Sequence, residues 1–134
     1  MTALSSYAER KILDHLFKNT SYTSPDAYVG AFTSDPTDSA SGTECSGSGY
    51  ARVQIDDKMS SSTTGADTSS ITNSSAITFS AASGGAWGTV THIGIFDASS
   101  SGNLLAHGAL ATSKTISDGD TLQIASSALT ITID

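Results

Sequence analysis

The chain has 134 residues, with six basic and thirteen acidic side chains that give a formal net charge of −7. Nucleic-acid binding needs a basic face that releases counterions, so this balance argues against nucleic acid as a partner. The single cysteine, Cys45, rules out an internal disulfide. No apolar run reaches the roughly 20 residues that a membrane-spanning helix needs, so we expect no membrane partner.

Composition points to a β-rich chain with many turns. Serine and threonine account for 25 and 18 residues, beside 12 glycines. Threonine favours strands, whereas serine and glycine favour turns. For this length we expect residues 1–134 to form a single domain with its own core. The N-terminus lacks the apolar segment of a secretory signal, because Glu9, Arg10 and Lys11 interrupt it, so we expect folding in a reducing cytoplasm.

The first predicted element is a helix over residues 5–18. The segment Ser6-Tyr7-Ala8-Glu9 matches the S-x-x-E capping box, and Lys18 lies in the last turn, where a cation suits the helix dipole. Apolar residues recur at three- and four-residue spacing and form one stripe: Leu4, Ala8, Ile12, Leu13, Leu16 and Phe17. A helix this short does not persist alone in water. We therefore expect the stripe to dock on the domain, with Leu13, Leu16 and Phe17 in the core.

Short strand-like segments separated by turn residues follow the helix. We predict strands at residues 27–33, 50–55, 76–79, 90–96 and 104–110, then a hairpin of 114–116 with 122–124 around Asp118-Gly119, and a closing strand in LTITID. No helical pattern separates these segments, which disfavours a parallel β-α-β architecture. The sequence therefore predicts a mainly β fold, an antiparallel β-sandwich or barrel of about seven strands with one N-terminal amphipathic helix.

Residues 57–75, DKMSSSTTGADTSSITNSS, are polar and low in complexity. Such a composition is typical of a flexible surface loop. The alternative is an arm that orders against a neighbouring subunit. The sequence leaves both interpretations open.

The segment WGTVTHIGIFDA, residues 87–98, brings the only tryptophan close to a histidine and an aspartate. Strand alternation places residues 90, 92, 94 and 96 on one face and residues 91, 93 and 95 on the other. Both faces are mainly apolar, which is typical of a central strand covered on both sides. We therefore expect Trp87, His92 and Phe96 to be structural core residues, with His92 hydrogen-bonded, and Asp97 to set a turn.

The sequence carries no recognisable catalytic, metal or cofactor motif. The three histidines do not form a pair at metal-ligand spacing, and no G-x-S-x-G elbow or Walker lysine occurs. Cys45 lies in GTECSGSG without a neighbouring histidine, which disfavours thiol catalysis. We therefore expect a protein that is not an enzyme, with no catalytic, metal-binding or cofactor-binding residue.

Four segments in order along the chain carry a family resemblance. SSYAERKILDHLF, GTECSGSGYARV, WGTVTHIGIFDASSSGNLLAHGAL and TLQIASSALTITID resemble the signature blocks of a family of small structural proteins of tailed bacteriophages and prophages. Members are commonly labelled tail-fibre or minor virion proteins. One departure is Cys45, where the family favours an aliphatic residue, and this leaves open whether that position packs in the core.

The resemblance implies a virion protein without catalysis or cofactor, made and folded in the host cytoplasm. Tail fibres are usually long chains with repeats or trimeric stalks, and this chain has no repeat or heptad. That contrast favours a capsid decoration protein that cements the outer head shell, with the major capsid protein and copies of itself, typically a trimer, as partners. The alternatives are a tail- or fibre-associated protein involved in host attachment and a module that binds a host-surface glycan.

Four basic residues are the candidates for assembly contacts. Arg10, Lys11 and Lys18 lie on the predicted helix, and Arg52 lies on the predicted strand over residues 50–55. We expect the helix or the 57–75 segment to make the contact with the shell.

Overall fold

The computed structural model describes residues 3–47 and 49–133. The elements, in chain order, are β1 (Ala3–Leu4), α1 (Ser6–Phe17), β2 (Tyr28–Phe32), β3 (Val53–Gln54), the 3-10 helix η1 (Asp56–Lys58), β4 (Thr63–Thr64), β5 (Ser69–Thr72), β6 (Ile77–Thr78), β7 (Gly88–Phe96), β8 (Leu104–Ile116), β9 (Gln123–Ile124) and β10 (Thr130–Ile133). The predicted mainly β, antiparallel, sandwich-like fold with one helix is confirmed. The described residues form ten strands rather than about seven, because several segments make only two-residue ladders.

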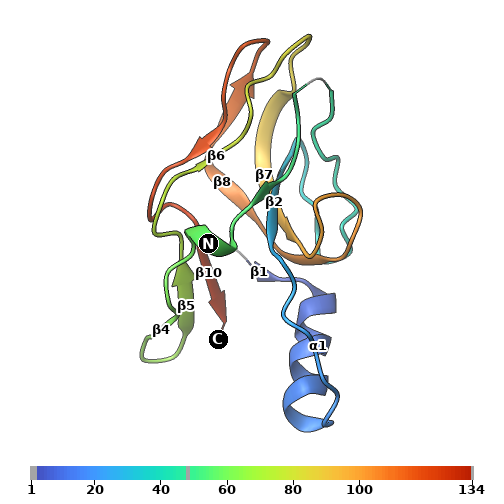
Figure 1. Ribbon diagram of the computed structural model, residues 1–134, viewed down its shortest axis with the longest axis vertical. Helices are drawn as coiled ribbons and strands as arrows, with labels where there is room; N and C mark the ends of the chain where they lie inside the picture. Colours follow the sequence, from blue (N-terminus) through green and yellow to red (C-terminus); the bar gives the residue numbers. More distant parts are fainter. Residues whose placement is uncertain (1–2, 48, 134) are drawn as a thin grey trace.

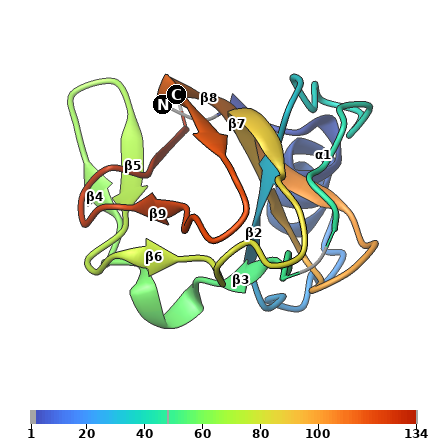
Figure 2. The same ribbon diagram turned by 90° about the horizontal axis from the view of Figure 1, so that it is seen from above.

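Three antiparallel sheets build the structure. The largest has the strand order β1-β8-β7-β2-β3, and the smaller ones are β10-β5-β4 and β6-β9. The pairing of β2 with β7 is regular and sets Val29 opposite Ile95 and Ala31 opposite Ile93. Seen from above, the two smaller sheets lie on one side of the β2-β7-β8 sheet and α1 lies on the other (Figure 2). The structure is therefore layered, with the helix outside the layers.

The main core lies between the five-stranded sheet and the two smaller sheets. Its buried members are Val29, Ala31, Cys45, Ile55, Ile77, Phe79, Ala82, Trp87, Val90, Ile93, Ile95, Ala106, Ile116, Leu122, Ile124 and Leu129. Trp87 packs edge-on against Tyr50 and Phe79, with ring centroids 5.2 and 6.1 Å apart. Cys45 is buried in this core, and burial, helped by the nearby charge of Glu44, raises the pKa of its thiol to about 11. The residue thus packs as a small apolar side chain would.

Strand β7 also buries side chains on its second face. Phe96 stacks on Phe32, with ring centroids 5.9 Å apart, and Leu104 completes this smaller cluster. Gly94 lies beneath the cluster, where a Cβ atom would come within about 3 Å of all three side chains. The second face is therefore packed too closely for any larger residue at this position.

Simple alternation misassigns Val90. It placed Val90 on the face of His92 and Phe96, but Val90 is fully buried in the main core. The ladder between β7 and β8 is irregular between Val90 and His92, and this irregularity changes the face that β7 presents. The alternation of residues in the sequence does not reveal such a bulge.

The predicted hairpin of residues 114–116 with 122–124 is wrong. Residues 114–116 are the end of the long strand β8, whereas β9 pairs with β6, with Ile124 opposite Ile77. A turn closed by the Asp120 amide and the Ser117 carbonyl, 3.0 Å apart, carries the chain from one sheet to the other. In this position Ile124 is buried in the main core.

Residues 57–75, predicted as a loop or an arm, contain the end of η1 and the strands β4 and β5. Strand β5 pairs with β10, with Ile71 opposite Ile131. Asn73 is buried at the end of β5, donates to the carbonyls of Ser75 and Ala125 at 2.9 and 2.8 Å, and accepts from the Leu129 amide at 2.9 Å. This one side chain ties the segment to the chain that leads into β10.

We expect Asn73→Ala to lower the free energy of unfolding by about 3 kcal/mol, because it removes three hydrogen bonds and leaves buried backbone groups without partners. Chemical denaturation of the purified protein measures the effect. The control is Gln123→Ala, which removes one exposed hydrogen bond to Thr78 and should cost no more than about 0.5 kcal/mol. Equal losses in the two variants would contradict the role of Asn73.

Candidate functional site: the groove between helix α1 and strand β10

Helix α1 is attached to the body by its first turn. Ser5 is the N-cap and accepts a hydrogen bond from the Ala8 amide at 3.2 Å, so the cap falls one residue before the Ser6 expected from the capping box. The Ser5 amide donates to the Leu105 carbonyl at 2.9 Å, and its hydroxyl donates to the Leu104 carbonyl. Ser5 therefore both starts the helix and fixes it to strand β8.

The later part of the apolar stripe of α1 faces solvent. Leu13, Leu16 and Phe17 are 57, 64 and 81% exposed, and Ala8 is the only buried residue of the helix. The prediction that these three residues lie in the core is wrong. The helix contacts the body near its N-terminal end and extends beyond the sheets (Figure 1), so its later turns reach no part of the core. Three large apolar side chains on one side of a helix form an exposed apolar patch, and such patches are typical of sites where another molecule binds.

The chain after α1 returns along the helix (Figure 1) and contacts a different side of it. The Tyr22 amide donates to His15 Nδ1 at 3.3 Å. Lys11 lies over the rings of Tyr7 and Tyr22, with its Nζ 5.4 and 5.9 Å from their centroids. This predicted assembly residue is therefore already engaged within the chain, in a cation–π contact.

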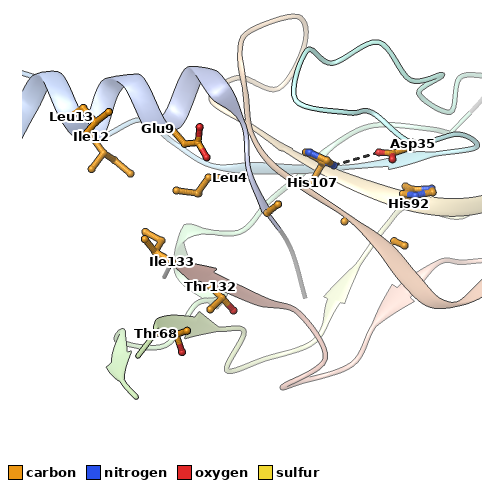
Figure 3. Close-up of a pocket in the computed structure, with 13 residues that line it drawn as sticks. Leu4, Glu9, Ile12, Leu13, Asp35, Thr68, His92, His107, Thr132 and Ile133 are labelled. Carbon is orange, nitrogen blue, oxygen red and sulfur yellow. Dashed lines mark ion pairs between the residues drawn. The ribbon is translucent and has the colours of Figure 1, made fainter. Parts of the chain in front are cut away.

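A groove of about 730 Å³ lies at the base of the helix, and its lining includes β1, β8 and the end of β10. The lining residues are Ala3, Leu4, Glu9, Ile12, Leu13, Asp35, Thr68, His92, His107, Gly108, Ala109, Thr132 and Ile133. Figure 3 shows Ile12 and Leu13 on one side and Ile133 and Thr132 on the other. Leu13 thus belongs both to the groove and to the exposed stripe.

The polar end of the groove is formed by histidines and aspartates. His107 Nε2 lies 3.0 Å from Asp38 Oδ1, and its Nδ1 lies 3.4 Å from Asp35 Oδ1 (Figure 3). The Thr37 amide, with further help from the neighbouring histidines, lowers the pKa of Asp35. His92 is half-buried, and its Nδ1 lies 2.9 Å from the Thr91 hydroxyl. His92 therefore lies in the groove wall and has the expected hydrogen bond, but it is not a core residue.

The four predicted assembly cations differ in their exposure. Arg10 on α1 and Lys18 at its C-cap are exposed, as is the groove residue Glu9, whereas Lys11 makes the cation–π contact described above. The side chain of Arg52 is only 6% exposed and binds both carboxylate oxygens of Glu44, with its Nη2 2.7 Å from Oε2. This side chain is therefore already engaged within the chain.

Arg52 links three parts of the chain behind the second face of β7. Its guanidinium lies 3.5 Å from the Phe96 ring centroid and donates to the carbonyls of Ala98 and Ser101 at 3.0 and 2.7 Å. Burial opposes ionisation of Glu44, but hydrogen bonds from Arg52 and Tyr50 outweigh it and lower the pKa of this carboxyl. The cluster is a structural contact between the segment before β3 and the turn after β7.

The lining of the groove combines apolar side chains with a few polar and charged ones. Within residues 3–47 and 49–133, no group of three histidine, cysteine, aspartate or glutamate side chains could hold a metal ion. In the same part of the chain, no helix is long and apolar enough to cross a membrane. What the site offers is apolar area beside exposed charges, which suits contact with another protein.

Residues 3–132 match the family described as Podophage GP4 fiber I protein gp80, and the chain belongs to this family. No curated protein matches the chain. The resemblance to phage structural proteins is confirmed, and the protein is a structural component of a phage virion.

Sequence reasoning did not anticipate the groove. Leu4 and Ile133 lie near opposite ends of the sequence and meet only because β1 and β10 are neighbours in space. The alternation in the closing segment LTITID indicates that Ile133 lies on an apolar strand face. It does not indicate which residues lie beside Ile133. The sequence pattern indicates only a helix-capping role for Glu9, not its place in the groove wall.

We expect Arg52→Met to lower the free energy of unfolding by about 2 kcal/mol, because the half-buried carboxylate of Glu44 would keep its charge without its cation. The matched control is Lys58→Met. The ion pair of Lys58 with Asp57, which is 76% exposed, should contribute less than about 1 kcal/mol. Comparable destabilisation of the two variants would show that Arg52 is not a buried link.

The same pair predicts a pH dependence. Because the pKa of Glu44 is lowered by folding, its contribution to stability is present above the usual glutamate pKa of 4.5 and is lost as the pH falls through the lower folded value. Denaturation midpoints measured from pH 6 to pH 3 should therefore fall more steeply for the wild type than for Arg52→Met. Parallel curves would contradict this assignment.

Proposed function

We infer that this chain is a fibre-associated structural protein of the phage tail whose assembly into the virion uses helix α1 and the groove at its base. The observation that carries this proposal is the exposed row of Leu13, Leu16 and Phe17 on a helix that extends from an otherwise closed β structure. An apolar row of this size in a monomer costs solubility, so it is expected where an assembly covers it.

The family description supports the tail rather than the head surface, because it names a fibre protein. The sequence favours a capsid decoration protein only because it contains no repeats or heptads. The absence of repeats argues against a long fibre shaft. It is compatible with a small subunit that attaches to a fibre or forms the tip of a fibre. The single short helix and the layered β body fit such a subunit.

The copy number of the chain per virion tests the location. Quantitative mass spectrometry of purified particles should find few copies relative to the major capsid protein, at a ratio close to that of other tail proteins in the same digest. A ratio close to that of the major capsid protein would place the chain on the head lattice and overturn the tail assignment.

The role of α1 in attachment has its own test. Virions assembled with Leu16→Ser and Phe17→Ser together should contain much less of this chain, because the variant loses the apolar row that its neighbour covers. The purified variant should keep its melting temperature, since both side chains are exposed in the isolated chain. Lys114→Ser, at an exposed position on β8, is the control that should enter virions normally. Normal incorporation of the double variant would contradict attachment through α1.

A further inference from the structure

The groove and the exposed stripe form one continuous apolar surface. Leu13 lines the groove, and Leu16 and Phe17 follow it at the three- and four-residue spacing that places side chains on one side of a helix. The helix wall of the groove therefore continues past the groove as a ridge. A molecule that carries both a ridge and a matching groove can bind another molecule of its own kind.

We propose that the groove holds helix α1 of a second copy of this chain, in an antiparallel pair in which each copy's Leu16 and Phe17 lie against the other copy's Leu4 and Ile133. The inference rests on the proposed function to the extent that both assign α1 to assembly. It goes further by naming what covers the helix.

The geometry of α1 suits a reciprocal pair. Twelve residues of helix extend roughly 18 Å, so the ridge at the tip and the groove at the base lie at opposite ends of one short surface. When two such surfaces are related by a two-fold axis, each ridge meets the other groove at the same time. The contact uses the same patch on both copies and closes on itself, which leaves no apolar end exposed.

The charges of the chain also favour a second copy. Residues 6–18 contain three of the six basic side chains and two of the thirteen acidic ones, so this helical segment carries +1 while the rest of the chain carries −8. In the antiparallel arrangement Lys18 at one tip comes beside Glu9, which lines the groove at the other helix's base. Opposite charges at the rim set the register of the pair, while the apolar contact supplies most of the affinity.

Sedimentation equilibrium of the purified full chain is the first experiment. The wild type should form a dimer whose dissociation constant rises roughly tenfold or more in Phe17→Ser, because a large apolar side chain loses its buried site. Circular dichroism should show that the variant remains folded, since Phe17 contacts solvent in the single chain. A wild type that stays monomeric at every accessible concentration overturns the proposal.

Charge reversal tests the register. Lys18→Glu should weaken the dimer by roughly two- to fivefold, and adding Glu9→Lys to it should restore the affinity. Lys114→Glu makes the same charge change on the exposed part of β8, away from the groove, and should leave the dimer unchanged. Equal effects of Lys18→Glu and Lys114→Glu would mean that only net charge matters and would refute the antiparallel register.

A crosslinking experiment identifies the occupant directly. A photoreactive benzoylphenylalanine in place of Phe17, in a mixture of isotopically light and heavy chains, should give mixed light–heavy crosslinks to peptides that contain Leu4 or Ile133. In virions, crosslinks only to a different virion protein would overturn the second copy as occupant. That outcome would leave the tail assignment standing, because the copy number decides it independently.

Discussion

The structure depends on the need to cover strand β7 on both faces. Ile93 and Ile95 on one face meet the core side chains of the two smaller sheets, while Phe96 on the other face stacks on Phe32. Neighbours β2 and β8 satisfy the backbone of β7, but they cannot cover either face. The rest of the chain is arranged around this requirement, with sheets on one side and connecting segments on the other.

Coverage of the second face explains the buried ion pair. No sheet lies there, so the segment before β3 and the turn after β7 close over Phe96, and Arg52 fills the space with its guanidinium against the ring. A buried cation needs a partner, and the isolated bridge between Phe32 and Glu44 brings the carboxylate into place. The buried ion pair therefore has a structural role in covering the second face of β7.

Helix α1 is the element that this arrangement leaves outside. Its N-cap, Ser5, is bound to the edge of the five-stranded sheet, and its later turns lie beyond the core of their own chain. A twelve-residue helix with an exposed apolar stripe gains little stability by itself, and the returning segment with Tyr22 supports only another side of it. Under the proposed function, a neighbouring subunit of the virion supplies the missing surface.

The sequence by itself determined the β class, the antiparallel arrangement, the position of the helix and the two apolar faces of the segment 90–96, because these follow from local periodicity and turn residues. Trp87 and Phe96 are buried where that periodicity placed them. Tertiary structure alone decided that β9 pairs with β6, that Arg52 is buried, and that Leu13, Leu16 and Phe17 face outward. The physical reason is that periodicity reports that a face needs cover but not which surface provides it. That choice depends on contacts between residues far apart in the chain, which no local pattern records.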